Sequence, residues 1–180
     1  MVYIILADGF EEIEALTPVD VLRRGGVSVA AVSVSGKTVT GSHNITVEAD
    51  MLIGDIPPEL PEMIVLPGGM PGTRNLDASE PLHELLRKAF DANIYIAAIC
   101  AAPMILGYAG YLNAKSATCY PGYDKYLIGA QKKTSQVVCD GNIITAASAG
   151  ASLEFAVKLL ELLKGKETAE KTLRQFNPYG

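Results

Sequence analysis

Short apolar runs alternate along this chain with longer segments in which apolar residues recur at helical spacing. The runs "VYIILA" (2–7), "VSVAAVSV" (27–34) and "IYIAAI" (94–99) carry no charge and are rich in Val, Ile and Ala. Strands that are buried on both faces give such continuous runs, and parallel sheets are buried in this way between two layers of helices. The pattern predicts an α/β fold with a mainly parallel sheet, and 180 residues suit a single domain over 1–180.

The segments between the runs show helix starts, helix stops and turns. Acids open the segment 11–26, and two arginines and two glycines close it, which predicts a helix that Pro18 bends or loosens. Polar and apolar residues alternate over 36–53, which predicts a small hairpin outside the main sheet. Further expected elements are a helix opened by Ser79, a short strand at 116–120, a hairpin through Asp140 and Gly141, and two helices after residue 150.

Charge and cysteine content exclude several classes of protein. The net charge is −5 and the basic residues are scattered, so no basic stripe is available for a nucleic acid. No run of 18 uncharged apolar residues occurs, so we expect no membrane span, and the early acids argue against a signal peptide. Three cysteines and two histidines without metal-binding spacing predict a reduced, cytoplasmic protein that holds no metal.

One thiol stands out in the otherwise apolar stretch "IYIAAICAAPMIL" (94–106). Cys100 follows a predicted buried strand and precedes a predicted helix, with alanines on both sides. At such a turn the backbone N–H groups can lower the pKa of a thiol and bind an oxyanion. The alternative is that Cys100 is a small buried apolar residue, as most free cysteines are. The spacing alone leaves both interpretations open.

Four stretches occur in a characteristic order: "GFEEIEALTPVDVLRRGG", "VLPGGMPG", "AAICAAP" and "LEFAVKLLELLKGK". In this order and spacing they resemble the ThiJ/PfpI superfamily, and within it the branch typified by the parkinsonism-associated protein deglycase. The resemblance covers nearly the whole chain. It implies a flavodoxin-like three-layer sandwich, usually a homodimer, with a reactive cysteine on a nucleophile elbow at Cys100.

The same resemblance implies the partners of this cysteine. It assigns Glu14 as a carboxylic acid that hydrogen-bonds the thiolate and carries a proton during turnover. The backbone N–H groups of Gly69 and Ala101 would form an oxyanion hole, and Gly68 would let the chain approach a ligand closely. For the neighbouring Glu11 and Glu12 we expect ordinary solvated positions near a helix start.

The chain departs from the family at positions that bear on the chemistry. Tyr120 stands where many members have a histidine; a tyrosine can bind a substrate by donating a hydrogen bond, but it is a poor base at neutral pH. His43 and His83 are not expected to reach the site. Ala101 replaces the histidine of the protease-like branches, which disfavours a Cys-His protease.

The two other cysteines receive simpler interpretations. Cys119 is expected to be a partly buried strand residue, although it could act as a resolving thiol, and Cys139 is expected to be incidental on its hairpin.

Two functions therefore remain in view. The first is a cofactor-free glyoxalase or deglycase activity on a small aldehyde such as methylglyoxal, with Cys100 as nucleophile and Glu14 as proton carrier. The second is a redox-sensing stress protein or chaperone in which Cys100 is oxidised to the sulfinate. A member of the fold without catalysis is a third possibility, because Tyr120 replaces the family histidine.

Overall fold

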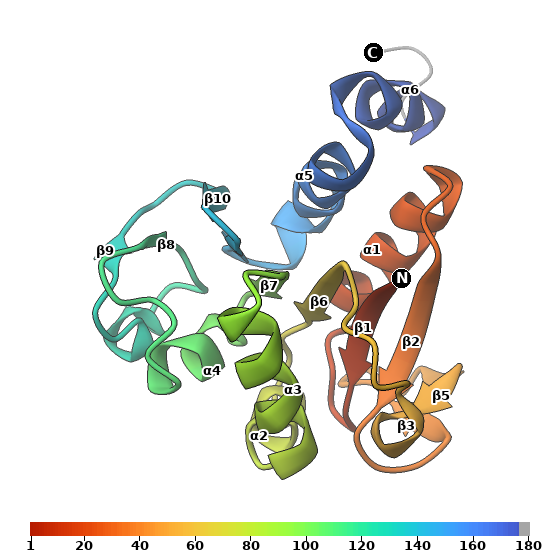
Figure 1. The fold of residues 1–180 in the computed structure, drawn as a ribbon, viewed down its shortest axis with the longest axis horizontal. Helices are drawn as coiled ribbons and strands as arrows, with labels where there is room; N and C mark the ends of the chain where they lie inside the picture. The colour runs from red at the N-terminus through yellow and green to blue at the C-terminus, as the bar shows by residue number, and fades with distance from the viewer. Residues whose placement is uncertain (177–180) are drawn as a thin grey trace.

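The central element of the computed structural model, which describes residues 1–176, is a seven-stranded sheet (Figure 1). All neighbouring strands pair in parallel except the edge strand β10. In spatial order the strands are β10 (Val137–Asp140), β11 (Ile143–Ala146), β7 (Tyr95–Ile99), β6 (Met63–Leu66), β1 (Val2–Leu6), β2 (Val29–Ser33) and β5 (Met51–Leu52). The predicted flavodoxin-like sandwich is confirmed, because the parallel strands follow the doubly wound order 2-1-3-4-5 with one short strand added beyond β2.

Helices cover both faces of this sheet, and each face has its own apolar core. On one face lie α1 (Glu12–Arg24) and α5 (Ser152–Lys164), with α6 (Lys166–Phe176) packed on α5. On the other lie α2 (Gly72–Asp77), α3 (Glu80–Asp91) and α4 (Pro103–Tyr108). Neighbouring residues of β1 alternate between the layers, since Ile4 belongs to the first core and Ile5 to the second. This explains why the strand sequences are apolar throughout.

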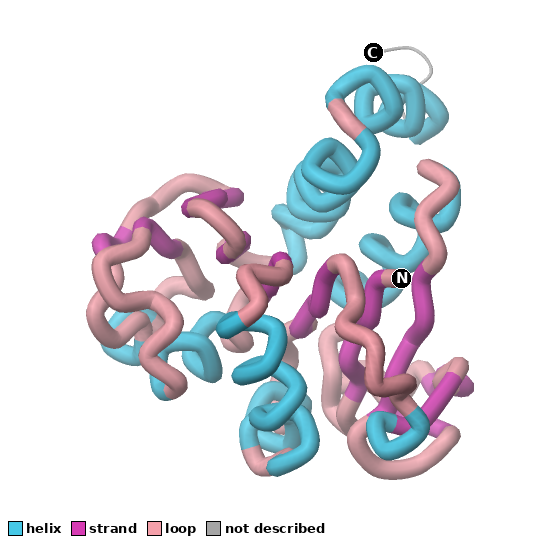
Figure 2. The backbone as a smooth tube through the Cα atoms, viewed as in Figure 1, coloured by secondary structure: helices cyan, strands magenta, loops and turns pink. Residues whose placement is uncertain are grey.

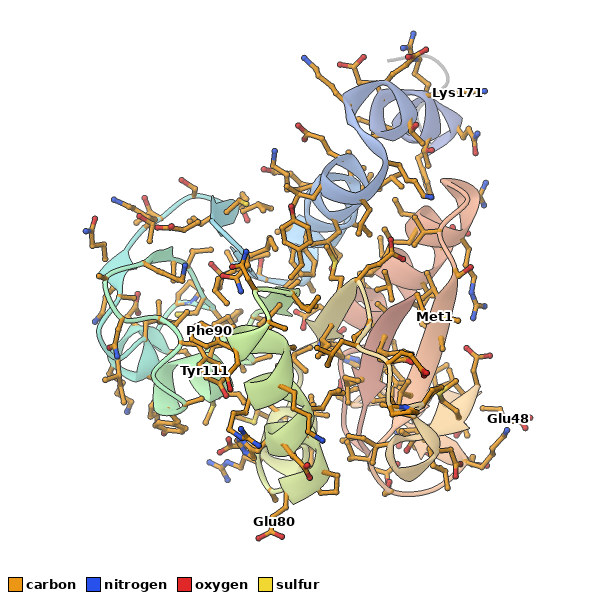
Figure 3. All side chains as sticks on the ribbon, viewed as in Figure 1. Met1, Glu48, Glu80, Phe90, Tyr111 and Lys171 are labelled. Carbon is orange, nitrogen blue, oxygen red and sulfur yellow. The ribbon has the colours of Figure 1, made fainter. Side chains whose placement is uncertain are left out.

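The helix limits follow the sequence signals. The Ser79 side chain accepts a hydrogen bond from the Leu82 N–H at the start of α3, as an N-cap does. Helix α1 ends before Gly25, and Gly26 adopts a φ of +74° that favours glycine. Pro18 lies inside α1, which continues past it, so the proline does not end the helix. On the second face, Phe90 of α3 stacks on Tyr111 with ring centroids 4.3 Å apart (Figure 3).

Two small sheets lie outside the main one. β3 (Thr38–Thr40) and β4 (Thr46–Glu48) form the predicted antiparallel hairpin, but residues 51–52 of the same predicted segment pair with β2 instead. The chain between α4 and β10 is mostly loop (Figure 2) and contains β8 (Ser116–Ala117) and β9 (Gln131–Lys132). The strand predicted at 116–120 therefore ends early. Three short 3₁₀ segments complete the fold, η1 (Ile53–Asp55), η2 (Asp124–Tyr126) and η3 (Ala149–Ala151).

The topology places a natural site at one edge of the sheet. The direction of winding reverses between β1 and β6, and ligands of open α/β sheets bind outside the carboxyl ends of the strands at such a point. The turns after β1, β6 and β7 meet there. Among the described residues, no helix has the length and apolar character needed to cross a membrane.

Candidate active site

Cys100 occupies a tight elbow between β7 and α4. Its φ is +63°, in the left-handed region that residues other than glycine rarely adopt. Two backbone hydrogen bonds hold this conformation, from the Cys100 N–H to the Ala146 carbonyl at 2.9 Å and from the Tyr120 N–H to the Cys100 carbonyl at 2.8 Å. The elbow predicted from the sequence is therefore present, with a thiol that is partly exposed.

Glu14 projects from the first turn of α1 into this site and is fully buried. Its Oε2 accepts a hydrogen bond from the Gly68 N–H at 2.8 Å, whereas Oε1 has no hydrogen-bond partner among residues 1–176. Gly68 lies between the side chains of Glu14 and Cys100. A Cβ at this position would come within 2.6 Å of the Glu14 carboxylate and 2.8 Å of the Cys100 Cβ, so only glycine lets the three groups meet.

The pKa values of both acids are raised in this enclosed site, chiefly by burial. Burial raises the pKa of Glu14 to about 7, against the opposing effects of its interaction with Cys100 and of the Gly68 hydrogen bond. Burial and the negative charge of Glu14 raise the pKa of the Cys100 thiol to about 12. This direction is opposite to the lowered thiol pKa expected from the elbow. Between these two values the pair retains one proton, which either group can hold.

The predicted oxyanion-hole residues also lie at the sulfur. The backbone N–H groups of Ala101 and Gly69 both act to lower the pKa of Cys100, although burial and Glu14 outweigh them. Gly69 has a φ of +88°, and a Cβ there would come within 2.4 Å of the Glu11 nitrogen. The turn after β6 can therefore pack against the turn after β1 only with glycine at this position.

The other residues singled out in the sequence differ in how near they lie to Cys100. Tyr120 is attached to the elbow through its backbone, while its side chain is exposed. Cys119 is buried in the turn after β8 and not in a strand, because the chain leaves β8 to reach the elbow. Cys139 is exposed on β10. His83 bonds the Asp77 carbonyl at the end of α2, as its predicted surface role suggests.

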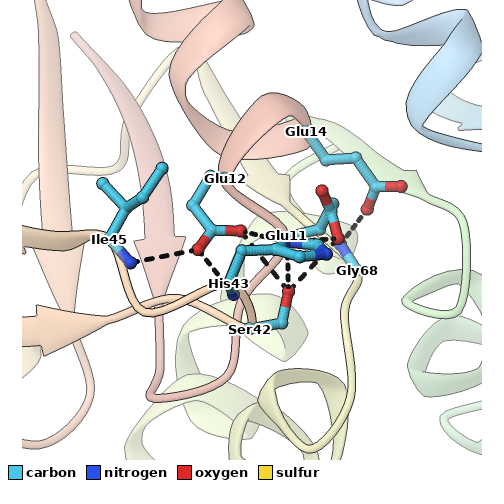
Figure 4. Close-up of polar contacts among 7 residues, drawn as sticks. All are labelled: Glu11, Glu12, Glu14, Ser42, His43, Ile45 and Gly68. Atoms are coloured by element: carbon cyan, nitrogen blue, oxygen red, sulfur yellow. Dashed lines mark hydrogen bonds and ion pairs between the residues drawn. The ribbon is translucent and has the colours of Figure 1, made fainter.

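The expectation of solvated acids is wrong for Glu12, which is buried beside the turn that joins β3 and β4. Its carboxylate accepts hydrogen bonds from the backbone N–H groups of His43 and Ile45, and its Oε2 lies 2.9 Å from His43 Nδ1 and 3.4 Å from the Ser42 hydroxyl (Figure 4). Sequence reasoning missed this contact because the partners are about 30 residues apart. The "GSHN" turn, whose Asn44 has a φ of +62°, was its only local signal.

Glu11, Glu12 and His43 could in principle hold a metal ion, since one ligand atom from each lies within 4.8 Å of the others. The Glu12 oxygens, however, already accept hydrogen bonds from the turn, and His43 Nδ1 faces Glu12. An ion would have to replace these contacts. The arrangement is better described as a network of ion pairs and hydrogen bonds.

The family model described as DJ-1/PfpI matches residues 1–162 of this chain, which include every site residue described above. The chain belongs to the DJ-1/PfpI family. The resemblance noted in the four sequence motifs is thereby confirmed.

Individual relatives from this family agree in sequence and in fold. Protein DJ-1 homolog B of Arabidopsis thaliana is 41% identical over 93% of this chain, and a Pyrococcus abyssi protein named a deglycase is 32% identical over 91% of this chain and 99% of its own length. The solved structure of oxidised Toxoplasma gondii DJ-1 superposes with a TM-score of 0.94 at 34% identity, covering 97% of this chain and 96% of that one. The chain spans 39% of the Arabidopsis protein, less than half of its length.

Proposed function

We propose that this DJ-1/PfpI chain is a cofactor-independent enzyme of the glyoxalase or deglycase type that acts on reactive aldehydes such as methylglyoxal. The observation that carries the proposal is the buried carboxyl of Glu14, which has one oxygen free beside the elbow thiol of Cys100. The deglycase name of the Pyrococcus relative supports the same reaction class. A role in the response to carbonyl stress would follow from such an activity.

The first step is addition of sulfur to the aldehyde. The Cys100 proton passes to Glu14, the sulfur forms a bond to the aldehyde carbon, and the electron pair of the C=O bond moves to oxygen. The N–H groups of Gly69 and Ala101 stabilise this oxyanion until it takes the proton from Glu14 to give a hemithioacetal. A Glu14 pKa of about 7 suits both directions of proton transfer, because the acid and its anion are both populated at neutral pH.

The second step is an internal rearrangement and hydrolysis. The carboxylate of Glu14 removes the hydrogen on the carbon that bears sulfur, which gives an enediol, and returns it to the neighbouring carbon. The hydroxyl proton of the first carbon moves to the former ketone oxygen, so the hemithioacetal becomes a thioester of lactate. Water then breaks the C–S bond, releases lactate and restores the thiol. Methylglyoxal and one water molecule thus give lactate without any external oxidant or reductant.

Lactate formation from methylglyoxal tests the proposal directly. We expect Cys100→Ser to lower kcat/KM at least ~100-fold and Glu14→Gln about 10- to 100-fold, by analogy with loss of a nucleophile or a general acid–base group. Cys139→Ser is the matched control, because that thiol is exposed on β10, and it should leave the rate unchanged. Equal rates for the wild type and Cys100→Ser would exclude this function.

A second candidate function is redox sensing through Cys100. Two equivalents of hydrogen peroxide would convert the thiol into a sulfinic acid and two molecules of water. The free oxygen of Glu14, when protonated, could donate a hydrogen bond to the sulfinate. Mass spectrometry after mild peroxide treatment should find two added oxygens on Cys100 before any on Cys119 or Cys139. Equal oxidation of all three cysteines would contradict this function.

We further propose a homodimer in a reducing compartment such as the cytoplasm, with no nucleic-acid or membrane partner. The exposed side chains of Ile13 and Leu16 on α1 and of Ile45 on the neighbouring turn offer an apolar surface for a second copy. All three cysteines are free in the described chain, as a reducing compartment requires. Light scattering should give twice the chain mass for the wild type and the single mass for Leu16→Glu.

A further inference from the structure

A polar cluster lies next to the candidate site without belonging to the proposed chemistry. We call Glu11, Glu12, Ser42 and His43 the turn cluster, because it joins the start of α1 to the turn between β3 and β4 (Figure 4). His43 Nδ1 lies 2.9 Å from Glu12 Oε2 and 3.6 Å from Glu11 Oε2. The Ser42 hydroxyl donates to Glu11 Oε2 at 3.2 Å. One imidazole therefore faces two carboxylates.

Gly68 connects the turn cluster to Glu14. Its carbonyl accepts the Glu11 N–H at 2.9 Å, and its own N–H donates to the Glu14 carboxylate at 2.8 Å. Glu11 and Glu14 thus lie on either side of one glycine, as Figure 4 shows. The negative charge of Glu11 acts on Glu14 and raises its pKa. A change of charge in the turn cluster must therefore reach the carboxyl group that serves Cys100.

His43 is the member of the cluster whose charge can change near neutral pH. The hydrogen bond with Glu12 and the charges of Glu11 and Glu12 raise the pKa of His43 above its ordinary value of 6.5. With both carboxylates ionised, the cluster carries one net negative charge while His43 is protonated and two when it is neutral. Loss of the His43 proton therefore doubles the net negative charge of the cluster.

We propose that His43 is an electrostatic positioning residue for the Cys100–Glu14 pair: its charge, held against Glu11 and Glu12, sets how readily Glu14 gives up its proton. The assignment concerns regulation of the same site, so its catalytic meaning rests on the proposed function. It also gives a role to a histidine that the sequence placed away from the chemistry. His43 need not touch the substrate to act in this way.

The sign of the effect follows from charge. When His43 loses its proton, the cluster becomes more negative and Glu14 holds its own proton to higher pH. Glu14 then remains a mixture of acid and anion over a wider range around neutrality, and both forms are needed in the proposed reaction. The charged or titratable groups that face this path are Glu12 and Glu11 at His43, and Glu11 and Cys100 at Glu14.

A titration of the Glu14 side-chain carboxyl by ¹³C NMR tests the proposal without any substrate. In His43→Gln the midpoint should rise by about 0.3–0.5 pH unit, the size expected for one solvent-screened charge that acts on a buried acid. In Glu11→Gln it should fall by a similar or larger amount. His43→Lys keeps the positive charge and should restore the wild-type midpoint. Lys166→Gln, a charge loss on the exposed face of α6, is the matched control and should change nothing.

Ionic strength separates electrostatics from a structural role. Raising the salt concentration from about 0.02 to about 0.5 M should shrink the His43→Gln shift by more than half. An unchanged midpoint in His43→Gln and Glu11→Gln would overturn the proposal. The same shift in His43→Lys as in His43→Gln would overturn it as well, since only the shape of the turn would then matter. Absence of lactate formation, by contrast, would remove the proposed function and leave this coupling intact.

Discussion

Glu12 and Glu14 lie two residues apart on one helix and are both buried, yet they behave in opposite ways. Burial favours the neutral form of each, but around Glu12 the side chain of His43 and the backbone N–H groups of the turn overcome burial and lower the pKa to about 2. Glu14 accepts one hydrogen bond from Gly68, and its pKa rises to about 7. The number of donors that the fold supplies, and not burial alone, decides whether a buried carboxyl is held as an anion or keeps its proton up to neutral pH.

Substitution Gly68→Ala should have the largest effect, because it removes the space that lets Glu14 meet Cys100. Its Cβ would meet the carboxylate, the Cys100 Cβ and the Ile99 carbonyl within 3.0 Å. We expect a loss of about 3 kcal/mol in unfolding free energy, typical of severe overpacking. Urea unfolding measures this loss. Gly54→Ala is the control, since its Cβ would meet nothing within 4 Å.

Glu14→Gln should make the protein more stable at pH 8 than the wild type. A folded-state pKa of about 7 against 4.5 for a free side chain means that the unfolded chain releases its proton first, so this group lowers stability as pH rises from about 4.5 to 7. Relative to the difference between the two proteins at pH 4, Glu14→Gln should gain about 2–3 kcal/mol of unfolding free energy at pH 8. Denaturant unfolding at both values checks this. Equal destabilisation of the variant at pH 4 and pH 8 would show that the pKa of Glu14 is not raised in the folded protein.

Glu12→Gln should have the opposite consequence. A pKa lowered from 4.5 to about 2 adds stability that is present above pH 4.5 and is lost as pH falls toward 2. The variant should lose about 1–2 kcal/mol at pH 7, after allowance for solvent screening, and should approach the wild type at pH 2–3. Unfolding curves at these values would decide the point, and a constant difference between the two proteins would contradict it.

Ser42→Ala should give the smallest change. Its hydroxyl donates to the Glu11 carboxylate over 3.2 Å and to the Glu12 carboxylate over 3.4 Å. Glu12 also accepts hydrogen bonds from other groups of the turn. Loss of one such partly exposed hydrogen bond costs about 0.5 kcal/mol. Thermal unfolding should detect it as a small decrease in Tm, and Ser42→Thr, which keeps the hydroxyl, should lie closer to the wild type. A loss as large as that of Glu12→Gln would mean that Ser42, and not Glu12, holds the turn.

The parts of the molecule that sequence predicts well depend on local patterns. Apolar runs such as 2–7 identify the buried strands, and Ser79 marks a helix start through contacts a few residues away. The strand-turn-helix pattern around Cys100 predicts a sharp turn in the same manner, while the family resemblance predicts the nucleophile elbow. The sequence pattern places residues 51–52 in the outer hairpin, because their actual pairing with β2 depends on residues far away in the sequence.

The candidate site shows the same limit. Sequence and resemblance together named Glu14, Gly68, Gly69 and Ala101, and the structure brings all of them to Cys100. They could not give the direction of the thiol pKa, because this depends on how much water the folded chain removes and on the charge of Glu14. The contact of Glu12 with the turn of residues 41–45 could not be predicted either, because no short-range sequence pattern links these segments.

The left-handed conformation of Cys100 has a consequence for how the site responds to partial unfolding. Non-glycine residues in this region cost about 1–2 kcal/mol, so the elbow persists only while β11 and the Tyr120 turn hold its N–H and carbonyl. Because β11 is paired on both sides within the sheet, the elbow is released when the sheet unfolds, and its thiol then becomes as reactive as a cysteine in an open chain. The alkylation rate of Cys100 in increasing urea should follow the cooperative transition of the sheet, which makes this one sulfur a built-in reporter of global folding.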